Sequence, residues 1–514
     1  MITRLKVDGF KNLINTDVSF GAFSCIAGAN GVGKSNLFDA IKFLSALADH
    51  KLIDAARQVR GGRVMDVKSL FNQTIGVESK KMSFLVEMIV PLKGEDDLGQ
   101  QAEASITFLK YELDIGYSDD ERRMSHGGLE ILKEELSHIN IGDSVRHLPF
   151  HPSEAWRKSA VRGRQTTKFI STEDEGTDHV QIKLHINRKQ GDVKGSGGRP
   201  SSYIAANLPK TVLSEVNSAE YRTALLARRE MQSWRLLQLE PTALREPDHI
   251  TSPQKIAENG AHLPSTLYRL EKDSVRYDGA EPGRVYARVA NRLSQLIEDV
   301  REVDVDRDEG RELLTLRVRG RNGVPHTARF LSDGTLRFLA LATLEQDMGA
   351  QGVICLEEPE NGIHPDRIPA ILKLLRDIAT DTNMQISPEN PDNPLRQIII
   401  NTHSPSVVRQ VDEDDLIVAT PTVQSINGKP ATYVRFSGLT GTWRSEISAP
   451  GVSIGQLLGY LDAGIDYDVE IDDIRVQEPP DKATQSAMLP RSRRVIDRLD
   501  VQQLRMTLIS DEKE

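Results

Sequence analysis

Residues 28–35 read Gly28-Ala-Asn-Gly-Val-Gly33-Lys34-Ser35 and match the pattern G-x-x-x-x-G-K-[ST]. The preceding residues, Ala22 to Ala27, predict a short buried strand, and Asn36 to Ala48 have the period of an amphipathic helix. A glycine-rich turn between a strand and a helix surrounds phosphate oxygens with backbone N–H groups, and the helix dipole adds to the attraction. This stretch therefore predicts a phosphate loop for a nucleoside triphosphate.

Each residue of the loop has an expected task. Lys34 is expected to reach the β- and γ-phosphates, and the Ser35 hydroxyl is expected to ligate Mg²⁺. The predicted cofactors are ATP and Mg²⁺, and the nucleotide contacts expected from this loop come from Gly28, Asn30, Gly31, Gly33, Lys34, Ser35 and Asn36.

Length and composition restrict the class of protein. A chain of 514 residues is too long for one compact core, so two or three domains are expected. No apolar run approaches the roughly 20 residues that cross a bilayer, and the first residues lack the apolar core of a signal peptide. Cys25 and Cys355 fall in apolar runs, which favours buried thiols over a disulfide. We expect a cytoplasmic protein without membrane contact.

The charge is distributed unevenly along the chain. The whole sequence has a net charge of −10, but Val145 to Arg235 holds 16 Lys/Arg and 9 Asp/Glu. This region, 145–235, could contact double-stranded DNA, or it could be an ordinary solvated surface. Composition alone leaves both interpretations open.

The pattern of elements predicts an α/β fold. Strands at Lys81–Pro91 and Ala104–Gly116 alternate with period two, as in a half-buried antiparallel pair. In the second half, apolar strands alternate with helices, which is typical of a parallel sheet covered on both faces. The expected helices are Lys210–Trp234, Val285–Asp299, Asp333–Gln346 and Pro365–Thr380, and the buried strands among them are Gly352–Leu356 and Gln397–Asn401.

Two acids end the strand that starts at Gly352. In a parallel sheet their carboxylates would lie at the carboxyl edge, beside the phosphate loop. Glu357 could hold Mg²⁺, and Glu358 could orient or deprotonate the water that attacks the γ-phosphate. Acids also end strands for no catalytic reason, so the catalytic interpretation of Glu357 and Glu358 depends on the presence of the phosphate loop.

Two further motifs carry anion-binding chemistry. Ser332, Asp333 and Gly334 open a helix, where a serine and a glycine can form a second anion site or a simple N-cap turn. His403 follows an apolar strand and could hydrogen-bond a γ-phosphate oxygen, although an isolated histidine is more often structural.

In this order, the motifs resemble those of the ABC-type ATPases of the RecF/SMC/OLD group. The closest resemblance is to stand-alone bacterial AAA family ATPases with Glu-Glu-Pro-Glu-Asn-Gly-x-His-Pro after the Walker B strand, and it covers about 1–115 and 235–420. It implies that Lys34 and Ser35 are the Walker A residues, Glu358 the catalytic glutamate and His403 the switch histidine. It also implies that Ser332, Asp333 and Gly334 form the signature motif, and that Gln73 is the Q-loop residue that joins Ser35 and Glu357 at the metal.

The resemblance also implies an architecture. This is an ABC-type P-loop domain whose mixed or parallel sheet is covered by helices, with an inserted α+β region and a small C-terminal extension. The expected boundaries are an N-terminal ATPase lobe at 1–116, the basic insertion at 117–235, a C-terminal ATPase lobe at 236–421 and the extension at 422–514.

Two departures from the family pattern bear on activity. Glu357 stands where aspartate is usual, and Ser-Asp-Gly-Thr replaces Ser-Gly-Gly-Gln. Both changes keep the acid or the helix cap, so ATP binding is expected to survive and turnover is expected to be slow.

The functional expectation is an ATPase that forms a homodimer around two nucleotides. It would sense or bind DNA and regulate a separate effector, such as a nuclease, in anti-phage defence. A RecF-like repair ATPase and an ATP-dependent scaffold with little hydrolysis are the alternatives, whereas a transporter ATPase is disfavoured. The acidic stretch Asp466–Asp473 lacks the surroundings of a Toprim nuclease site and is interpreted as surface.

Overall fold

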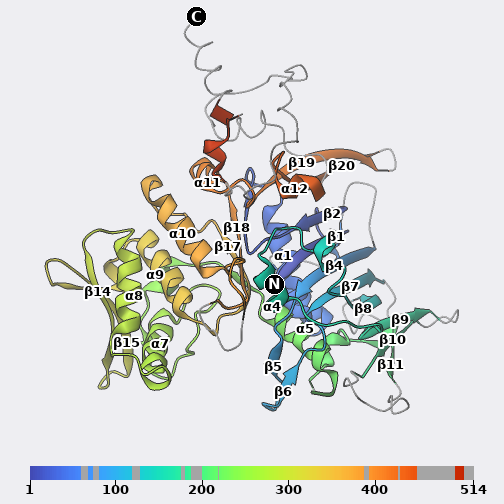
Figure 1. Ribbon diagram of the computed structural model, residues 1–514, viewed down its shortest axis with the longest axis horizontal. Helices are drawn as coiled ribbons and strands as arrows, with labels where there is room; N and C mark the ends of the chain where they lie inside the picture. Colours follow the sequence, from blue (N-terminus) through green and yellow to red (C-terminus); the bar gives the residue numbers. More distant parts are fainter. Residues whose placement is uncertain are drawn as a thin grey trace, which may run out of the picture.

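The computed structural model describes residues 1–59, 67–72, 80–118, 128–174, 180–186, 200–217, 219–386, 393–426, 429–447, 493–499 and 501–502. Two large sheets and the helices around them form the body of the molecule, and a lobe of helices with a small sheet lies to one side (Figure 1). No helix in these ranges is long and apolar enough to span a membrane.

The larger sheet has eight antiparallel strands in the order β11-β10-β9-β8-β7-β4-β1-β2. Their bounds are β1 (Ile2–Asp8), β2 (Thr16–Ser19), β4 (Lys81–Ile89), β7 (Phe108–Tyr117), β8 (Leu129–His138), β9 (Ile170–Asp174), β10 (Val180–Leu184) and β11 (Ser201–Ile204). The predicted antiparallel pair is confirmed, because β4 pairs with β7 in a register that opposes Phe84 and Leu113. Strands from the expected insertion extend the same sheet.

The second sheet carries the phosphate loop. Its order is β12 (Arg235–Leu237), β17 (Gly352–Glu357), β18 (Arg396–Thr402), β3 (Phe23–Ala27), β19 (Leu416–Ile426) and β20 (Lys429–Gly438). All neighbours are parallel except β19 and β20, which form an antiparallel hairpin. Every residue of β3 and β18 is buried, as expected for a parallel sheet covered on both faces. The predicted α/β fold class is confirmed.

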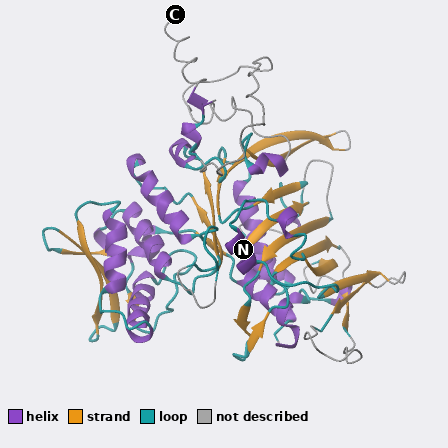
Figure 2. Cartoon of the chain, in the orientation of Figure 1, coloured by secondary structure: helices purple, strands orange, loops and turns teal. Residues whose placement is uncertain are grey.

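Alternate side chains of the central strands enter two separate cores. Ile26 and Ile399 join the core that includes the eight-stranded sheet, α1 (Lys34–Leu47) and α5 (Arg222–Gln232). Cys25 and Ile400 point the other way, into a core made with the helical lobe. That lobe contains α7 (Leu263–Tyr277), α8 (Arg284–Ser294), α9 (Asp333–Gln346), α10 (Ile368–Ile378) and the strands β13 (Asp248–His249), β14 (Val300–Asp308), β15 (Leu313–Gly320) and β16 (Pro325–Thr327). Figure 2 shows these helices in purple on the opposite side of the central strands from α1.

Shorter elements connect the main ones. They are α2 (Leu52–Gln58), α3 (Ser144–His147), α4 (Glu154–Ala160), α6 (Pro241–Arg245), α11 (Pro405–Gln410), α12 (Trp443–Ile447) and the hairpin of β5 (Lys93–Glu95) and β6 (Gln101–Glu103). The residues at 493–499 pack beside α11, where the Val495 N–H donates to the Val411 carbonyl at 3.0 Å. Cys25 and Cys355 are buried free thiols, as predicted.

The predicted long helix Lys210–Trp234 is wrong. The segment contains 3-10 turns at Leu213–Glu215 and Ala219–Tyr221, and only α5 is α-helical. The buried carboxylate of Glu134 accepts the backbone N–H groups of Val212 and Leu213 at 2.7 and 2.9 Å. This tertiary contact fixes the backbone in a turn, whereas the apolar spacing alone favoured a helix.

The acidic stretch Asp466–Asp473 lies outside the described residues. Helix α7 was not predicted; Pro264 is accommodated in its first turn.

Candidate nucleotide-binding site

The phosphate loop connects the buried strand β3 to α1. Gly31 and Gly33 have positive φ angles of 80° and 115°, which other residues rarely adopt. A Cβ on Gly33 would lie 2.3 Å from Nδ2 of Asn12, and one on Gly28 would lie 2.6 Å from the carbonyl oxygen of Ala419. Conformation requires a glycine at Gly31 and Gly33, and close packing requires one at Gly28 and Gly33.

Asn12 contacts the loop from the turn between β1 and β2. Its Nδ2 donates to the Val32 carbonyl at 3.0 Å, and its Oδ1 accepts from Nδ2 of Asn36 at 2.7 Å. One amide thus joins the middle of the phosphate loop to the first turn of α1. The edge of the antiparallel sheet thereby supports a loop that belongs to the parallel sheet.

Lys34 is folded over its own loop. Its Nζ donates to the carbonyl oxygens of Gly28 and Ala29, and its side chain is buried. Burial lowers the pKa of Lys34, and the nearby carboxylates of Glu358 and Glu357 act in the opposite direction. The predicted phosphate-binding lysine and the two predicted acids are therefore neighbours in space.

Glu357 ends β17 and is held by two amides. Gln238 Nε2 donates to Oε2 of Glu357 at 2.9 Å, and Asn401 Nδ2 lies 3.4 Å from its Oε1. Gln238 is there because β12 runs parallel to β17 and ends beside it, with Leu237 opposite Leu356. Sequence reasoning missed Gln238, since a three-residue strand has no recognisable periodicity.

Glu358 has a positive φ angle of 45°, which is uncommon for a glutamate. Its backbone N–H donates to the Asn401 carbonyl at 3.1 Å. Its carboxylate is held on both sides, by Nδ1 of His403 at 2.6 Å from Oε1 and by Asn361 Nδ2 at 2.8 Å from Oε2. Uncommon backbone conformations of this kind concentrate at functional sites. The structure thus brings together two residues predicted from motifs 45 positions apart.

Ser332 forms the N-cap of α9, where its Oγ accepts from the Thr335 backbone N–H at 3.3 Å. Gly334 packs directly on the loop after Glu358, because a Cβ there would lie 2.3 Å from the Gly362 carbonyl oxygen. Ser332, Asp333 and Gly334 are all described, and none of them lines the cavity at the phosphate loop. The predicted signature motif is therefore not part of this cavity's lining in its own chain.

A cavity of about 610 Å³ lies in front of the phosphate loop. It has the size of a small-molecule site. The residues that line it are Asn30, Gly31, Gly33, Lys34, Ser35, Asn36, Leu237, Gln238, Leu239, Glu240, Pro241, Arg337, Leu356, Glu357, Glu358, Pro359, Asn361 and Asn401. Of these, sequence reasoning missed Gln238, Arg337, Asn361 and Asn401.

The donor set of this cavity suits Mg²⁺. Ser35, Glu357 and Gln238 offer a hydroxyl, a carboxylate and an amide oxygen, and Mg²⁺ binds one or two carboxylates together with phosphate oxygens. The described residues contain no cluster of three or more His, Cys, Asp or Glu that could hold a metal by themselves. Gln73, the glutamine that the sequence predicted for this role, lies outside the described residues, so its assignment stays a prediction.

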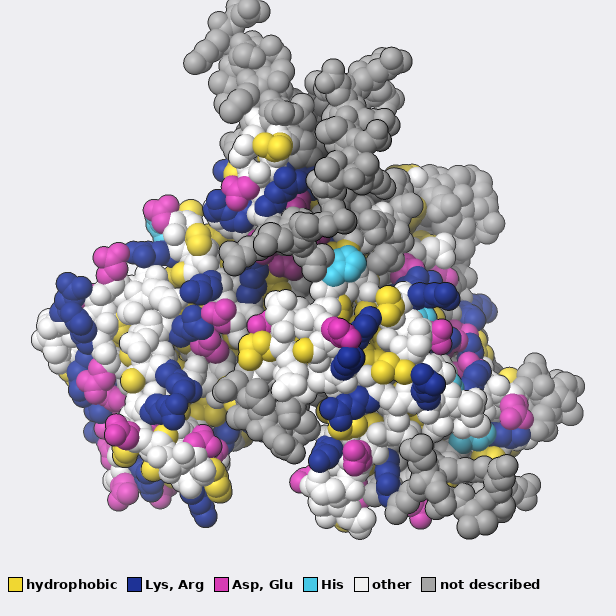
Figure 3. Space-filling model, viewed as in Figure 1, with side chains coloured by type: hydrophobic (Ala, Val, Ile, Leu, Met, Phe, Trp, Pro, Cys, Tyr) yellow, Lys and Arg dark blue, Asp and Glu magenta, His cyan; other side chains and the backbone are white. Residues whose placement is uncertain are grey.

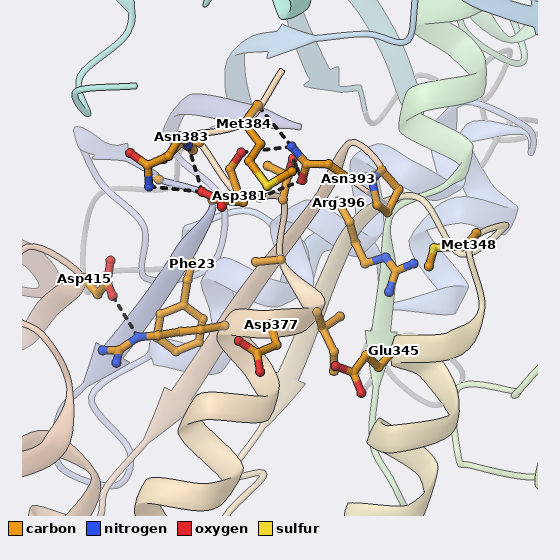
Figure 4. A pocket seen from close by; sticks show the side chains of 18 of the residues that line it. Phe23, Glu345, Met348, Asp377, Asp381, Asn383, Met384, Asn393, Arg396 and Asp415 are labelled. Carbon is orange, nitrogen blue, oxygen red and sulfur yellow. Dashed lines mark hydrogen bonds and ion pairs between the residues drawn. The ribbon is translucent and has the colours of Figure 1, made fainter. Parts of the chain in front are cut away.

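A larger cavity, of about 900 Å³, lies at the opposite edge of the same sheet (Figure 4). Phe23 and Arg396 begin β3 and β18 there, whereas the phosphate loop follows the other end of β3. Some of its charges pair within the lining, since Arg376 lies 3.1 Å from Asp412 and 3.4 Å from Asp415. The position and the internal ion pairs separate this cavity from the nucleotide site.

The solved structures that resemble this chain include heads of Smc proteins. An "SmcHead bound to the C-winged helix domain of ScpA" shares 13% identity over 85% of this chain and 98% of its own, with a TM-score of 0.44. An Smc head with an extended coiled coil from Pyrococcus furiosus shares 13% identity over 85% of this chain and 96% of its own, with a TM-score of 0.39. The SMC head of Thermotoga maritima shares 12% identity over 85% of this chain and 98% of its own, with a TM-score of 0.33. At TM-scores below 0.5 these likenesses say nothing about activity or partners. No curated protein matches significantly.

A protein family gives the clearer result. The family described as "AAA domain, putative AbiEii toxin, Type IV TA system" matches residues 23–141 and 214–409. The matched segments cover more than half of the chain and contain the phosphate loop, Ser332, Glu357, Glu358 and His403. The chain therefore belongs to this family of AAA domains.

Proposed function

We propose that the chain is an ABC-type ATPase that binds and hydrolyses ATP, dimerises when ATP is bound and regulates a partner effector. The observation that carries the proposal is the arrangement around the 610 Å³ cavity. Lys34 and Ser35 face Glu357 and Glu358 across it, and His403 is bonded to Glu358. These are the groups that in-line phosphoryl transfer to water requires.

Each side chain has a task in that reaction. Lys34 and the N-terminus of α1 bind the β- and γ-phosphates, since both present positive charge to the cavity. Glu358 orients the attacking water and accepts its proton. Nδ1 of His403 holds Glu358, and its Nε2 is the ring atom through which a γ-phosphate oxygen would be sensed. Mg²⁺, held by Ser35 and Glu357, would neutralise charge that develops on the phosphate oxygens.

The dimer follows from what the cavity lacks in its own chain. Ser35 is the only hydroxyl in its described lining, and the one helix N-terminus there besides that of α1 belongs to the five-residue α6, with Glu240 at its N-cap, whereas Ser332 at the start of α9 lies outside the lining. A second copy could bring its Ser332 turn to the γ-phosphate. Two nucleotides would then be enclosed between two chains, with Glu358 and the Asn361–Ile363 loop at the seam.

A regulatory role fits the family description better than a metabolic one. That description names a putative toxin of a "Type IV TA system". We infer that ATP controls assembly with an effector, such as a nuclease, in anti-phage defence.

Contact with double-stranded DNA through region 145–235 is part of the proposal. Much of its charge is neutralised locally, since Lys168 lies 2.9 Å from Glu135 and Lys158 lies 2.6 Å from Glu154. Arg162 and Arg164 are exposed. Figure 3 shows Lys and Arg spread over the visible face with Asp and Glu among them, so any DNA contact would involve few side chains.

The test compares the purified parent chain with K34A and E358Q. K34A is expected to lose ATP binding, whereas E358Q is expected to keep it, to slow hydrolysis at least about a hundredfold and to sediment as a dimer with ATP. A pull-down with and without a non-hydrolysable ATP analogue then identifies the effector. Equal turnover of E358Q and the parent would overturn the catalytic assignment, and an E358Q chain that stays monomeric with ATP would overturn the dimer.

A further inference from the structure

Asp333 is the first residue of α9 and directly follows the N-cap Ser332. Its carboxylate is 51% exposed. An acid at this position stabilises a helix through the dipole, but it also repels an approaching phosphate. A turn that must receive a phosphate therefore needs this negative charge to be compensated.

Arg245, the last residue of α6, lies against this turn. Its Nη2 donates to the Leu331 carbonyl oxygen at 3.1 Å and also to Oδ1 of Asp333. One guanidinium nitrogen thus holds the chain on both sides of Ser332. The Arg245 side chain is 28% exposed, so the ion pair is partly shielded from solvent.

The turn has room for a side chain at Asp333 but not at Gly334. A Cβ on Gly334 would collide with the Gly362 carbonyl oxygen, so that position is closed to side chains. Asp333 instead points outward to Arg245. Asp333 therefore leaves the packing of the turn intact and alters its charge.

Arg245 also belongs to a segment that reaches the nucleotide cavity. Residues 237–241 line the cavity, Gln238 bonds to Glu357, and α6 follows at once. In return, Arg337 of α9 donates from Nε to the Leu239 carbonyl at 3.2 Å. The segment 237–245 is thus fixed to the cavity at one end and to the Ser332 turn at the other.

We propose that Arg245 is a positioning residue: it neutralises Asp333 and holds the Ser332 turn so that this turn accepts the γ-phosphate of the nucleotide bound by a second copy. The inference rests on the ATP-dependent dimer proposed above. The Arg245–Asp333 pair takes the place of an uncharged residue after Ser332, and removal of Arg245 alone exposes the phosphate to an unpaired carboxylate.

The test is a double-mutant cycle on the full chain with R245A, D333G and the double variant. R245A is expected to lower kcat at least tenfold in the parent chain but less than threefold in the D333G chain, because no carboxylate is left unpaired there. Affinity for ADP should stay within twofold of the parent, since Arg245 does not line the cavity. If R245A lowers kcat equally in the parent chain and in the D333G chain, Arg245 does not act by compensating the charge of Asp333, and the proposal is overturned.

R329A is the matched control. Arg329 is exposed and lies 3.8 Å from Glu246, so its removal costs the same charge next to the same turn. It is expected to show no coupling to D333G; a coupling as large as that of R245A would reduce the effect to general electrostatics and overturn the proposal. If R245A does not fold, R245Q keeps the aliphatic stem and enters the same cycle.

A second readout separates this inference from the proposed function. In the E358Q background, ATP-dependent dimerisation is measured by sedimentation with and without R245A. An E358Q chain that never dimerises contradicts the proposed function itself. A dimer that forms equally well in both cases contradicts only the role of Arg245, whereas a dimer at least tenfold weaker with R245A supports it.

Discussion

Gln238 and Glu357 are joined by a hydrogen bond of 2.9 Å between Nε2 and Oε2, across two strands that lie side by side in the sheet but 119 positions apart in the chain. Q238A removes this bond and an oxygen donor from the cavity. We expect kcat to fall about tenfold and the Mg²⁺ concentration for half-maximal activity to rise, because Glu357 loses its orientation. A magnesium titration of Q238A beside Q73A decides between the two glutamines: a larger shift for Q73A would favour the sequence-based assignment.

His403 restrains Glu358 through its Nδ1. We expect H403A to lower kcat about tenfold or more and to leave ADP affinity near that of the parent, because the carboxylate loses one of its two side-chain partners. Steady-state hydrolysis and ADP titration measure the two effects. A variant that loses ADP affinity as strongly as kcat would show that His403 supports the fold of the site and has no role in the reaction.

Asn12 stabilises the phosphate loop through the Val32 carbonyl. Loss of one such hydrogen bond is worth about 1 kcal/mol, so N12A should weaken ADP binding about fivefold. The matched control is N72A, because Asn72 donates to the Lys11 carbonyl in the same turn. Equal ADP affinities of N12A and N72A, with equal melting temperatures, would contradict a specific role for Asn12.

Glu134 predicts a pH dependence of stability. Burial raises its pKa to about 7, above the ordinary value of 4.5, so the folded chain binds a proton that the unfolded chain has released between these limits. The free energy of unfolding should therefore fall as the pH rises from about 4.5 to 7, by on the order of 3 kcal/mol. Denaturant unfolding from pH 5 to 8 should give a flatter profile for E134Q. Parallel profiles would show that Glu134 is already ionised in the folded chain.

Reversal of Arg157, Lys158, Arg162 and Arg164 to glutamate tests the DNA contact. If this surface neutralises phosphates, affinity for double-stranded DNA at moderate salt should fall more than tenfold, and the slope of log affinity against log salt should become shallower. Fluorescence anisotropy at three salt concentrations measures both. Unchanged affinity would show that these residues belong to a solvated surface.

Local motifs made the phosphate loop and α9 predictable. The glycine and lysine spacing of Gly28–Ser35 predicted a phosphate loop at the start of a helix, and α1 begins there. The bounds of α9 coincide with the predicted Asp333–Gln346 because Ser332 is a strong N-cap. The rule for parallel strands predicted that Glu357, Glu358 and His403 lie at one edge of the sheet. They meet there, with 2.6 Å between Glu358 and His403.

Other parts depend on tertiary contacts that leave no local trace. Gln238 and Asn12 acquire their places only when distant strands pair, and neither stands in a motif. The segment after Lys210 has helical spacing, but the Glu134 carboxylate captures its backbone N–H groups. A single sequence shows which residues carry chemistry, but it does not show which polar side chains will support them.

The neighbours of β3 have a consequence for biosynthesis. This strand ends at Ala27, but it pairs with β18 and β19, which begin much later in the chain, at Arg396 and Leu416. At roughly 5–20 residues per second, translation needs on the order of 20 to 80 s to reach them. The nascent polypeptide must therefore carry an apolar strand without its partners during this interval. The parallel sheet that carries the phosphate loop can form only after β18 and β19 have been made.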